Sequence, residues 1–310
     1  MKHKNFSLSC SRITEQRGII MSRTITGKIC FPQWLAGCII LLLSCPVNVP
    51  AANYEITKLS NTVYAAIATL DSKAVSNAMF VVTGHEVILA GAHFVPEGVA
   101  ELLKEIGKIT PLPVSHVILT HHHRGFNYVD FDLPEKAEIL ASTQIWQELT
   151  AESREFKNAN LVFEDSLTLN RGATSLILQS MGKGHSNGDV IVYLPKEGIL
   201  FASDLLFNDI VGYMGEASVL DWGEILEHLE DIPARVVIPG VGMVTDSAGI
   251  SRFKKFYRAF MTEVLRNVEK GNSLSQTKKE FSLEEFRSLP GFKTFVDVNL
   301  ERAYKQLKSQ

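Results

Sequence analysis

The pattern of apolar and polar positions from residue 53 onward predicts short strands that alternate with amphipathic helices. Short apolar runs rich in β-branched side chains, separated by turn residues, are typical of strands. Gly84-His85 stands between two such runs and predicts a tight hairpin. Pro96 precedes apolar positions at helical spacing, as in the first turn of a helix. The first half is expected to contain strands at 53–57, 62–68, 77–83, 86–90, 114–119 and 138–141, with helices at 96–107 and 143–157.

The second half repeats this order of strands followed by helices. A strand at 198–203 is expected to end on Asp204, and Asp221 is a candidate cap for the next helix. The remaining expectations are strands at 160–163, 167–169, 174–180, 189–195 and 235–239, with helices at 221–229, 246–269, 282–289 and 294–308. Two halves that each begin with hairpins predict an α+β fold in which two sheets pack face to face with helices outside.

The first fifty-one residues have the layout of a secretory signal peptide. Arg23 and Lys28 precede the apolar run 34–43, and small residues suited to cleavage follow at 49–52. The chain would then comprise a signal peptide at 1–51, with Met21 as a possible true start, and a single domain at 52–310. The apolar run is too short for a comfortable membrane span, so we expect no stable span in the mature chain and a periplasmic or secreted location. Two alternatives remain, an uncleaved anchor and a less favoured lipid anchor at Cys38 or Cys45.

Removal of the leader would change the cysteine content and the net charge of the chain. All four cysteines lie before residue 52, so the mature chain would have neither a disulfide framework nor a thiolate ligand. Any metal must then be held by His, Asp or Glu. The leader carries six Lys/Arg and one acid, a net of +5, so the whole-chain charge of −3 becomes −8 in the mature chain. An acidic body argues against nucleic acid or an anionic membrane as a partner.

Three histidines follow the apolar run 114–119 directly, in the segment Thr120-His-His-His-Arg-Gly-Phe126. Side chains alternate along an extended chain, so His121 and His123 can point the same way while His122 points opposite. Two imidazoles on one side of a strand end can form half of a metal site. His116, inside the strand, is expected to be a packed or edge histidine, and His122 to belong to the loop.

The order of these features resembles the metallo-β-lactamase superfamily. Thr-His-x-His is followed by Gly-His-Ser at 184–186, by an aspartate at a strand end and by Pro-Gly-x-Gly at 239–242. The resemblance covers about residues 54–246 and implies an αββα sandwich of two mixed sheets flanked by helices, with metal-bearing loops along one edge. It implies that His121, His123 and His185 bind the first metal, and that Asp204 matches the bridging aspartate.

The chain departs from the family pattern at the second metal. Gly125, Phe126 and Val241 stand where the family has an aspartate and two histidines, and none of them can ligate a metal. An aspartate usual after the early hairpin is also missing from 90–93, and His93 there is expected to be structural or exposed. The expected site is therefore one Zn²⁺ per chain on three imidazoles, with water or Asp204 as the fourth ligand.

Two functions remain open. The first is a secreted zinc hydrolase that attacks a small-molecule ester, lactone, thioester or amide, in which Asp204 is a catalytic base or a ligand. A β-lactamase is the less favoured activity. The second is a catalytically inactive binding or accessory protein of the cell envelope, favoured by the apolar residues in the second metal site. Protein partners are not predicted by the sequence.

Overall fold

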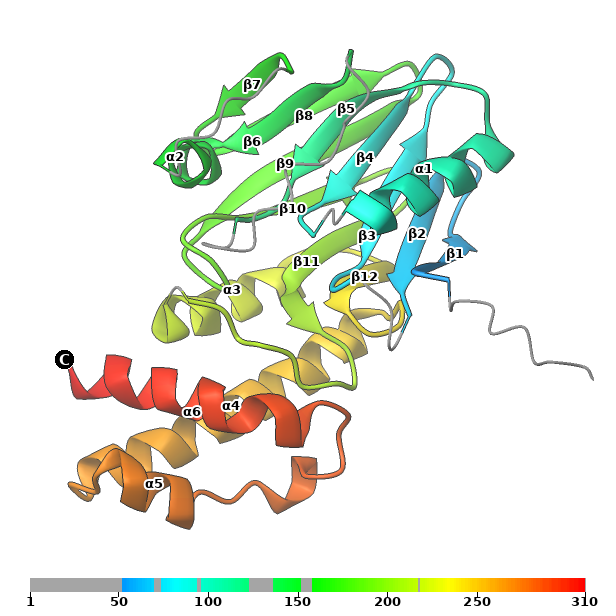
Figure 1. Cartoon of the computed structure of the whole chain (residues 1–310). Coiled ribbons are helices and arrows are strands. Elements are labelled where there is room, and N and C mark those ends of the chain that lie inside the picture. Colours follow the sequence, from blue (N-terminus) through cyan, green and yellow to red (C-terminus); the bar gives the residue numbers. More distant parts are fainter. Residues whose placement is uncertain are drawn as a thin grey trace, which may run out of the picture. The chain divides into compact units, whose positions relative to one another are not determined.

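Two mixed β-sheets lie at the centre of the computed structural model (Figure 1). The structure describes residues 52–69, 74–93, 96–122, 136–151, 158–216 and 218–309. The seven-stranded sheet runs in chain order, antiparallel from β1 to β4 and parallel from β4 to β7. Its strands are β1 (Tyr54–Lys58), β2 (Val63–Ala68), β3 (Ala78–Val82), β4 (Val87–Gly91), β5 (Val114–Leu119), β6 (Glu138–Ser142) and β7 (Asn160–Phe163).

The five-stranded sheet has the order β12-β11-β10-β9-β8 and is antiparallel except for the β11–β12 pair. Its strands are β8 (Ser166–Arg171), β9 (Thr174–Gly182), β10 (Asp189–Leu194), β11 (Ile199–Phe207) and β12 (Val236–Val241). Antiparallel strands need only short turns, whereas the parallel pairs β4–β5, β6–β7 and β11–β12 are joined through longer connections that include helices. The predicted hairpin at Gly84-His85 is confirmed by the antiparallel pairing of β3 with β4.

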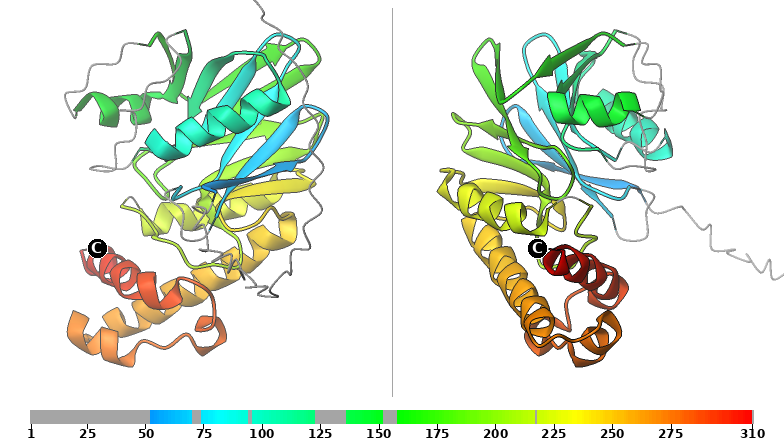
Figure 2. Two further views of the ribbon diagram at one scale, coloured as in Figure 1. Left: turned by 45° about the vertical axis from the view of Figure 1, so that its right-hand side comes forward. Right: turned by 90° about the vertical axis from the view of Figure 1, so that its left-hand side faces the viewer.

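Helices cover both outer faces of the sandwich (Figure 2). Helices α1 (Pro96–Ile109) and α2 (Thr143–Ala151) pack on the seven-stranded sheet, and α3 (Val219–Asp231) and α4 (Ser247–Glu269) on the other. The chain ends with α5 (Leu274–Glu280), a 3₁₀ turn (Glu284–Phe286) and α6 (Phe292–Lys308), which pack against α4. This arrangement confirms the predicted αββα sandwich. No helix in the described ranges is long and apolar enough to cross a membrane.

Strand β11 connects the two hydrophobic clusters of the fold. All nine of its residues are buried. Ile199 and Phe201 belong to the cluster between the sheets, whereas Leu200 and Ala202 belong to the cluster under α3 and α4. Because side chains alternate across a strand, a strand covered on both faces needs apolar residues at successive positions. The strand was expected to end on Asp204, but it continues to Phe207 because its last residues also pack into the second cluster.

Two helix predictions are corrected by local hydrogen bonds. The helix expected at 221–229 begins at Val219, because the Ser218 hydroxyl accepts the Asp221 backbone N–H at 3.2 Å and takes the cap position. The prediction of a helix at 282–289 is wrong, because this range contains only the 3₁₀ turn Glu284–Phe286. A capping box between Ser273 and Gln276 starts α5 earlier, and the segment after α5 contributes apolar side chains to the second cluster instead of continuing as a helix.

Asn77 joins the segment before β3 to the loop after β12. Its Oδ1 accepts the Ala68 backbone N–H at 2.8 Å, and its Nδ2 donates to the carbonyls of Pro239 and Gly242, each at 2.8 Å. Its own backbone N–H donates to the Gly240 carbonyl at 2.7 Å. A buried amide with all these partners holds strands of different sheets in one register. The neighbouring Ser76 is thereby fixed beside the strand that carries Asp204.

Candidate metal centre

His121 follows the end of β5 at a point where both sheets are tied together. The backbone N–H of the preceding Thr120 donates to the Gly91 carbonyl at 3.0 Å, and its carbonyl accepts the Val190 N–H at 2.7 Å. The Thr120 hydroxyl lies 2.7 Å from that of Ser203. Because these bonds reach three other strands or strand ends, the backbone at residue 120 is held rigidly. The backbone that carries the buried His121 side chain is therefore held in place.

His185 lies in a loop between β9 and β10 that closes around a buried carboxylate. Oδ2 of Asp189 accepts the backbone N–H groups of Gly184 and Ser186 at 3.1 and 3.0 Å, and Oδ1 accepts the Ser186 hydroxyl at 2.9 Å. The His185 ring packs edge-on against Trp222, with ring centroids 5.6 Å apart. The loop and the indole together fix the imidazole.

Asp204 enters the site from the middle of β11. Its Oδ1 accepts the Ser76 hydroxyl at 2.5 Å. The residue before it, Ser203, has a φ of +50°, a left-handed backbone conformation that is unfavourable for residues other than glycine. The Ser203 hydroxyl lies 3.4 Å from Nδ1 of His121, so the strained residue also contacts the histidine. Backbone strain of this kind is concentrated at functional sites, where the surrounding structure holds it in place.

Three imidazole nitrogens surround one carboxylate oxygen. Oδ2 of Asp204 lies 3.3 Å from Nε2 of His93, 3.6 Å from Nε2 of His121 and 3.5 Å from Nε2 of His185. Nε2 of His93 and Nε2 of His121 are 3.1 Å apart. Ligands at 2.0–2.1 Å around a tetrahedral zinc are separated by roughly 3.3–3.4 Å. The ligand atoms of His93, His121 and Asp204 lie within 4.8 Å of one another, so these three residues could hold one zinc ion. His185 contacts the carboxylate but lies outside this group.

The structure brings together three of the four residues that the sequence singled out. His121, His185 and Asp204 lie in one cluster, whereas His123 lies outside the described residues. The same holds for Gly125 and Phe126.

His93 is buried rather than exposed, with 8% of its surface exposed, and it lies within the cluster at the edge where the sequence places an active-site residue. The signal was available in the topology, because β4 and β5 are parallel neighbours and the residues after their ends meet at the same edge. By contrast, His116 is confirmed as a packed histidine, with Nδ1 2.8 Å from Oε2 of Glu86.

Burial and contacts within the cluster shift the pKa values of His185 and Asp204. Burial lowers the pKa of His185 to about 4, although Asp204 opposes this shift, so the imidazole is neutral at neutral pH as metal binding requires. Burial disfavours the ionised form of Asp204, but the imidazoles of His121, His93 and His185 outweigh it and hold its pKa well below the usual value. The site therefore presents one carboxylate among imidazole nitrogens, a donor set suited to zinc.

Comparison with known proteins identifies the family. A model described as the metallo-beta-lactamase superfamily matches residues 133–241, which include His185 and Asp204. The metallo-beta-lactamase type 2 of Bacteroides fragilis is 26% identical over 201 residues, covering 61% of this chain and 79% of that protein. These matches support membership of the metallo-β-lactamase superfamily.

Further relatives agree with this family. Metallo-beta-lactamase IND-1 of Chryseobacterium indologenes is 25% identical over 190 residues, covering 57% of this chain and 77% of that protein. A solved metallo-beta-lactamase from Pontibacter korlensis superposes with a TM-score of 0.58 at 23% identity, over 66% of this chain and 99% of that one. The structural likeness supports the fold of this superfamily member.

A cavity of about 500 Å³ adjoins the cluster. Three of its walls come from the cluster, from the segment after β11 and from helix α6. Val241, which the motif predicts to stand in the place of a family histidine, also lines this cavity. The lining residues are Val75, His93, His185, Asp204, Phe207, Ile210, Val211, Gly212, Tyr213, Val241, Thr294, Phe295 and Val298.

Gly240 should tolerate no side chain. A Cβ there would lie 2.0 Å from Oδ1 of Asp204 and 2.5 Å from its backbone nitrogen, so the strand and the carboxylate would have to move. We expect Gly240→Ala to lower the free energy of unfolding by about 1–3 kcal/mol or more, measured by urea denaturation. Gly107→Ala is the matched control, because a Cβ meets nothing within 4 Å there and alanine favours a helix. Equal stability of the two variants would contradict this interpretation.

The carboxylate of Asp189 should make stability depend on pH. Burial raises its pKa to about 7, against the opposing hydrogen bonds from Ser186 and Gly184. A folded-state pKa above the unfolded value contributes stability that is fully present below about pH 4 and is lost as the pH rises through 7. The free energy of unfolding of the wild type, minus that of Asp189→Asn, should therefore fall by about 2–3 kcal/mol between pH 5 and pH 8, with chelator present in both samples. If this difference in the free energy of unfolding stays constant or rises between pH 5 and pH 8, the Asp189 carboxyl does not cause the pH dependence.

Proposed function

We propose that this superfamily member is a zinc-dependent hydrolase that acts on small-molecule esters, lactones, thioesters or amides. The observation that carries the proposal is the convergence of three imidazole nitrogens and one carboxylate oxygen beside a cavity. Membership of the superfamily supports a hydrolase and a metal site in general terms. The identity of the metal and the class of substrate are the new parts of the proposal.

The proposed ligands are His121, His185 and Asp204, with His93 added by the structure; His123 stays a prediction from the motif. A zinc ion bound there would lower the pKa of water and polarise a carbonyl oxygen. The protein supplies the orientation of the donors through the hydroxyls of Ser76 and Ser203. Such supporting hydrogen bonds fix ligand orientation and basicity in metal sites.

Asp204 is better suited to binding metal than to acting as a free base. Its Oδ2 faces three imidazoles, and its Oδ1 is engaged by the Ser76 hydroxyl. Both oxygens therefore have fixed partners. Tyr213 and Thr294 are the other lining residues with side-chain hydroxyls. The Tyr213 hydroxyl donates to Oε1 of Glu216 at 3.3 Å and accepts from Arg302 at 3.0 Å, so Thr294 is the better candidate to donate a hydrogen bond to a substrate oxygen.

One zinc per chain is the expected content. Val241 lines the cavity with an apolar side chain where the family has a histidine, and Gly125 and Phe126 carry no ligand atom in their side chains. The same apolar replacement favours the second candidate, an inactive binding or accessory protein on this fold. Such a protein would bind a ligand in the cavity without turning it over.

The chain is proposed to act in the periplasm or outside the cell after loss of residues 1–51. The support is the sequence alone, namely the cationic start, the short apolar run and the small residues that follow it.

The metal site is tested by the metal content of the purified chain, measured for wild type, His121→Ala, His93→Ala and His228→Ala. We expect about one zinc per wild-type chain. We expect His121→Ala and His93→Ala to lose most of it, because each removes a nitrogen of the cluster. His228→Ala is the matched control, since that side chain lies on α3 with its Nε2 3.3 Å from Gln179.

A screen of ester and lactone hydrolysis then separates the two candidates. Turnover that disappears with chelator and returns with zinc supports the hydrolase. Bound zinc without turnover of any substrate supports the accessory protein. Absence of metal even after zinc reconstitution would overturn the metal centre itself.

The leader is tested by expressing the full chain in a Gram-negative host and sequencing the N-terminus of the protein recovered from the periplasm. A chain that begins near residue 52 is the expected result. An intact N-terminus in the cytoplasm would contradict the proposed location.

A further inference from the structure

Helix α6 forms one wall of the cavity beside the metal centre and contributes Thr294, Phe295 and Val298. We propose that the substrate carries an uncharged apolar chain, which lies in this cavity between the cluster and α6 while its reacting carbonyl faces the histidines. This inference deepens the proposed hydrolase and rests on it.

The lining of the cavity is apolar away from the cluster. Its described residues beyond the cluster are apolar or glycine, apart from Tyr213 and Thr294. Phe207 and Phe295 supply aromatic surface, and the volume of about 500 Å³ is within the range of roughly 300–1,000 Å³ usual for small-molecule sites. An alkyl or acyl chain would gain free energy by leaving water in such a place, whereas a polar chain would lose hydrogen bonds.

Two exposed apolar side chains also belong to the lining. Val75 is 55% exposed and Val298 is 41% exposed, and both are large hydrophobic residues in contact with solvent. Val75 lies in the segment before β3 and Val298 lies on α6, so each of these two segments places an exposed apolar side chain at the cavity. Solvent-exposed apolar residues that continue into a cavity favour the entry of an apolar ligand.

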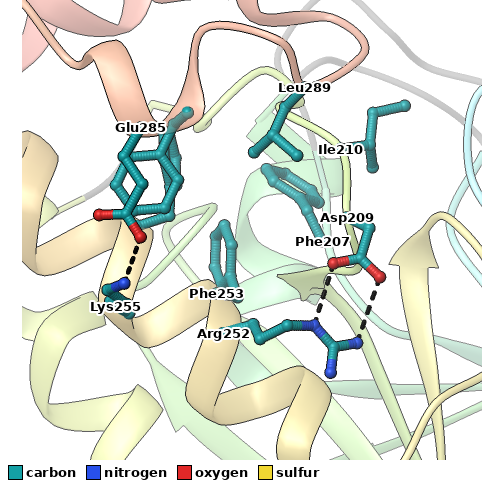
Figure 3. A pocket seen from close by; sticks show the side chains of 10 residues that line it. Phe207, Asp209, Ile210, Arg252, Phe253, Lys255, Glu285 and Leu289 are labelled. Carbon is teal, nitrogen blue, oxygen red and sulfur yellow. Dashed lines mark hydrogen bonds and ion pairs between the residues drawn. The ribbon is translucent and has the colours of Figure 1, made fainter.

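The described cations near this region are engaged by other partners. The described lining of the cavity contains neither lysine nor arginine. Arg252 and Lys255 line a neighbouring cavity of about 240 Å³, on which Phe207 and Ile210 also border (Figure 3).

In that neighbouring cavity both cations are in ion pairs. Nε of Arg252 lies 3.0 Å from Oδ1 of Asp209, and Lys255 pairs with Glu285 (Figure 3). Arg302, on α6, donates to the Tyr213 hydroxyl at 3.0 Å and lies 3.7 Å from Oε1 of Glu216. An anionic group on the substrate chain would therefore meet no counter-charge in the described lining, which favours a neutral chain.

Two measurements on the zinc-loaded protein test this inference. The first is the kcat/KM for p-nitrophenyl esters from acetate to decanoate, beside an ester of similar length that ends in a carboxylate. The second is calorimetric binding of 2-hexanone, 2-octanone and 2-decanone, which are not hydrolysed. We expect both kcat/KM and affinity to rise about two- to fourfold per added methylene until the cavity is filled, and the terminal carboxylate to abolish the gain.

Val298→Lys should flatten the dependence on chain length in both measurements, because it places a charge in the lining. Leu265→Lys is the matched control, since Leu265 is a similarly exposed apolar residue of α4 outside the cavity. Thermal unfolding of both variants shows whether each remains folded, and Val298→Thr provides a milder change at the same site.

The possible outcomes distinguish a failure of the apolar-chain inference from a failure of the proposed hydrolase. Binding of the ketones that strengthens with chain length, without ester hydrolysis, supports the apolar cavity and contradicts the hydrolase. Hydrolysis with no dependence on chain length, or a preference for the ester with the terminal carboxylate, overturns the inference and leaves the hydrolase standing.

Discussion

The carboxylate of Asp204 is buried among three imidazoles, and the loops of this fold are arranged to keep it there. A buried charge is strongly unfavourable unless it is paired and hydrogen-bonded. Oδ2 is surrounded by the nitrogens of His93, His121 and His185, and Oδ1 receives the Ser76 hydroxyl. These partners come from four separate places in the chain. The cluster can therefore form only when both sheets have assembled.

Several features away from the cluster are explained by this requirement. Asn77 fixes the segment that presents Ser76, and Gly240 leaves room for the carboxylate beside β12. Ser203 adopts an unfavourable left-handed backbone conformation immediately before Asp204. Asp189 closes the loop that carries His185. Each of these residues contacts or borders a member of the cluster, as supporting residues do around a metal site.

The terminal helices link the metal centre to the class of ligand. Helix α6 packs against α4 and also lines the cavity beside His185, so the residues that close the second hydrophobic cluster face the site as well. Val241, which the motif places where the family has a histidine, contributes to the same apolar wall. The proposed single zinc and the proposed apolar substrate chain are both consistent with this replacement.

The sequence by itself determined the alternation of strands and helices, the family, and three members of the cluster. Period-2 and period-3.6 patterns are local, and His121, His185 and Asp204 each lie in a recognisable motif at a strand end or glycine-rich loop. The sequence misplaced the helix expected at 282–289, because a capping box and packing against α4 act there together.

Only the tertiary structure brought His93 into the cluster and made α6 a wall of the cavity. His93 has no motif around it, and it joins the cluster because parallel pairing of β4 with β5 brings the ends of those strands together. Val298 is about ninety residues beyond Asp204 in the chain and reaches the same cavity through the packing of α6. Contacts between residues far apart in sequence depend on the assembled fold, and a local pattern carries no information about them.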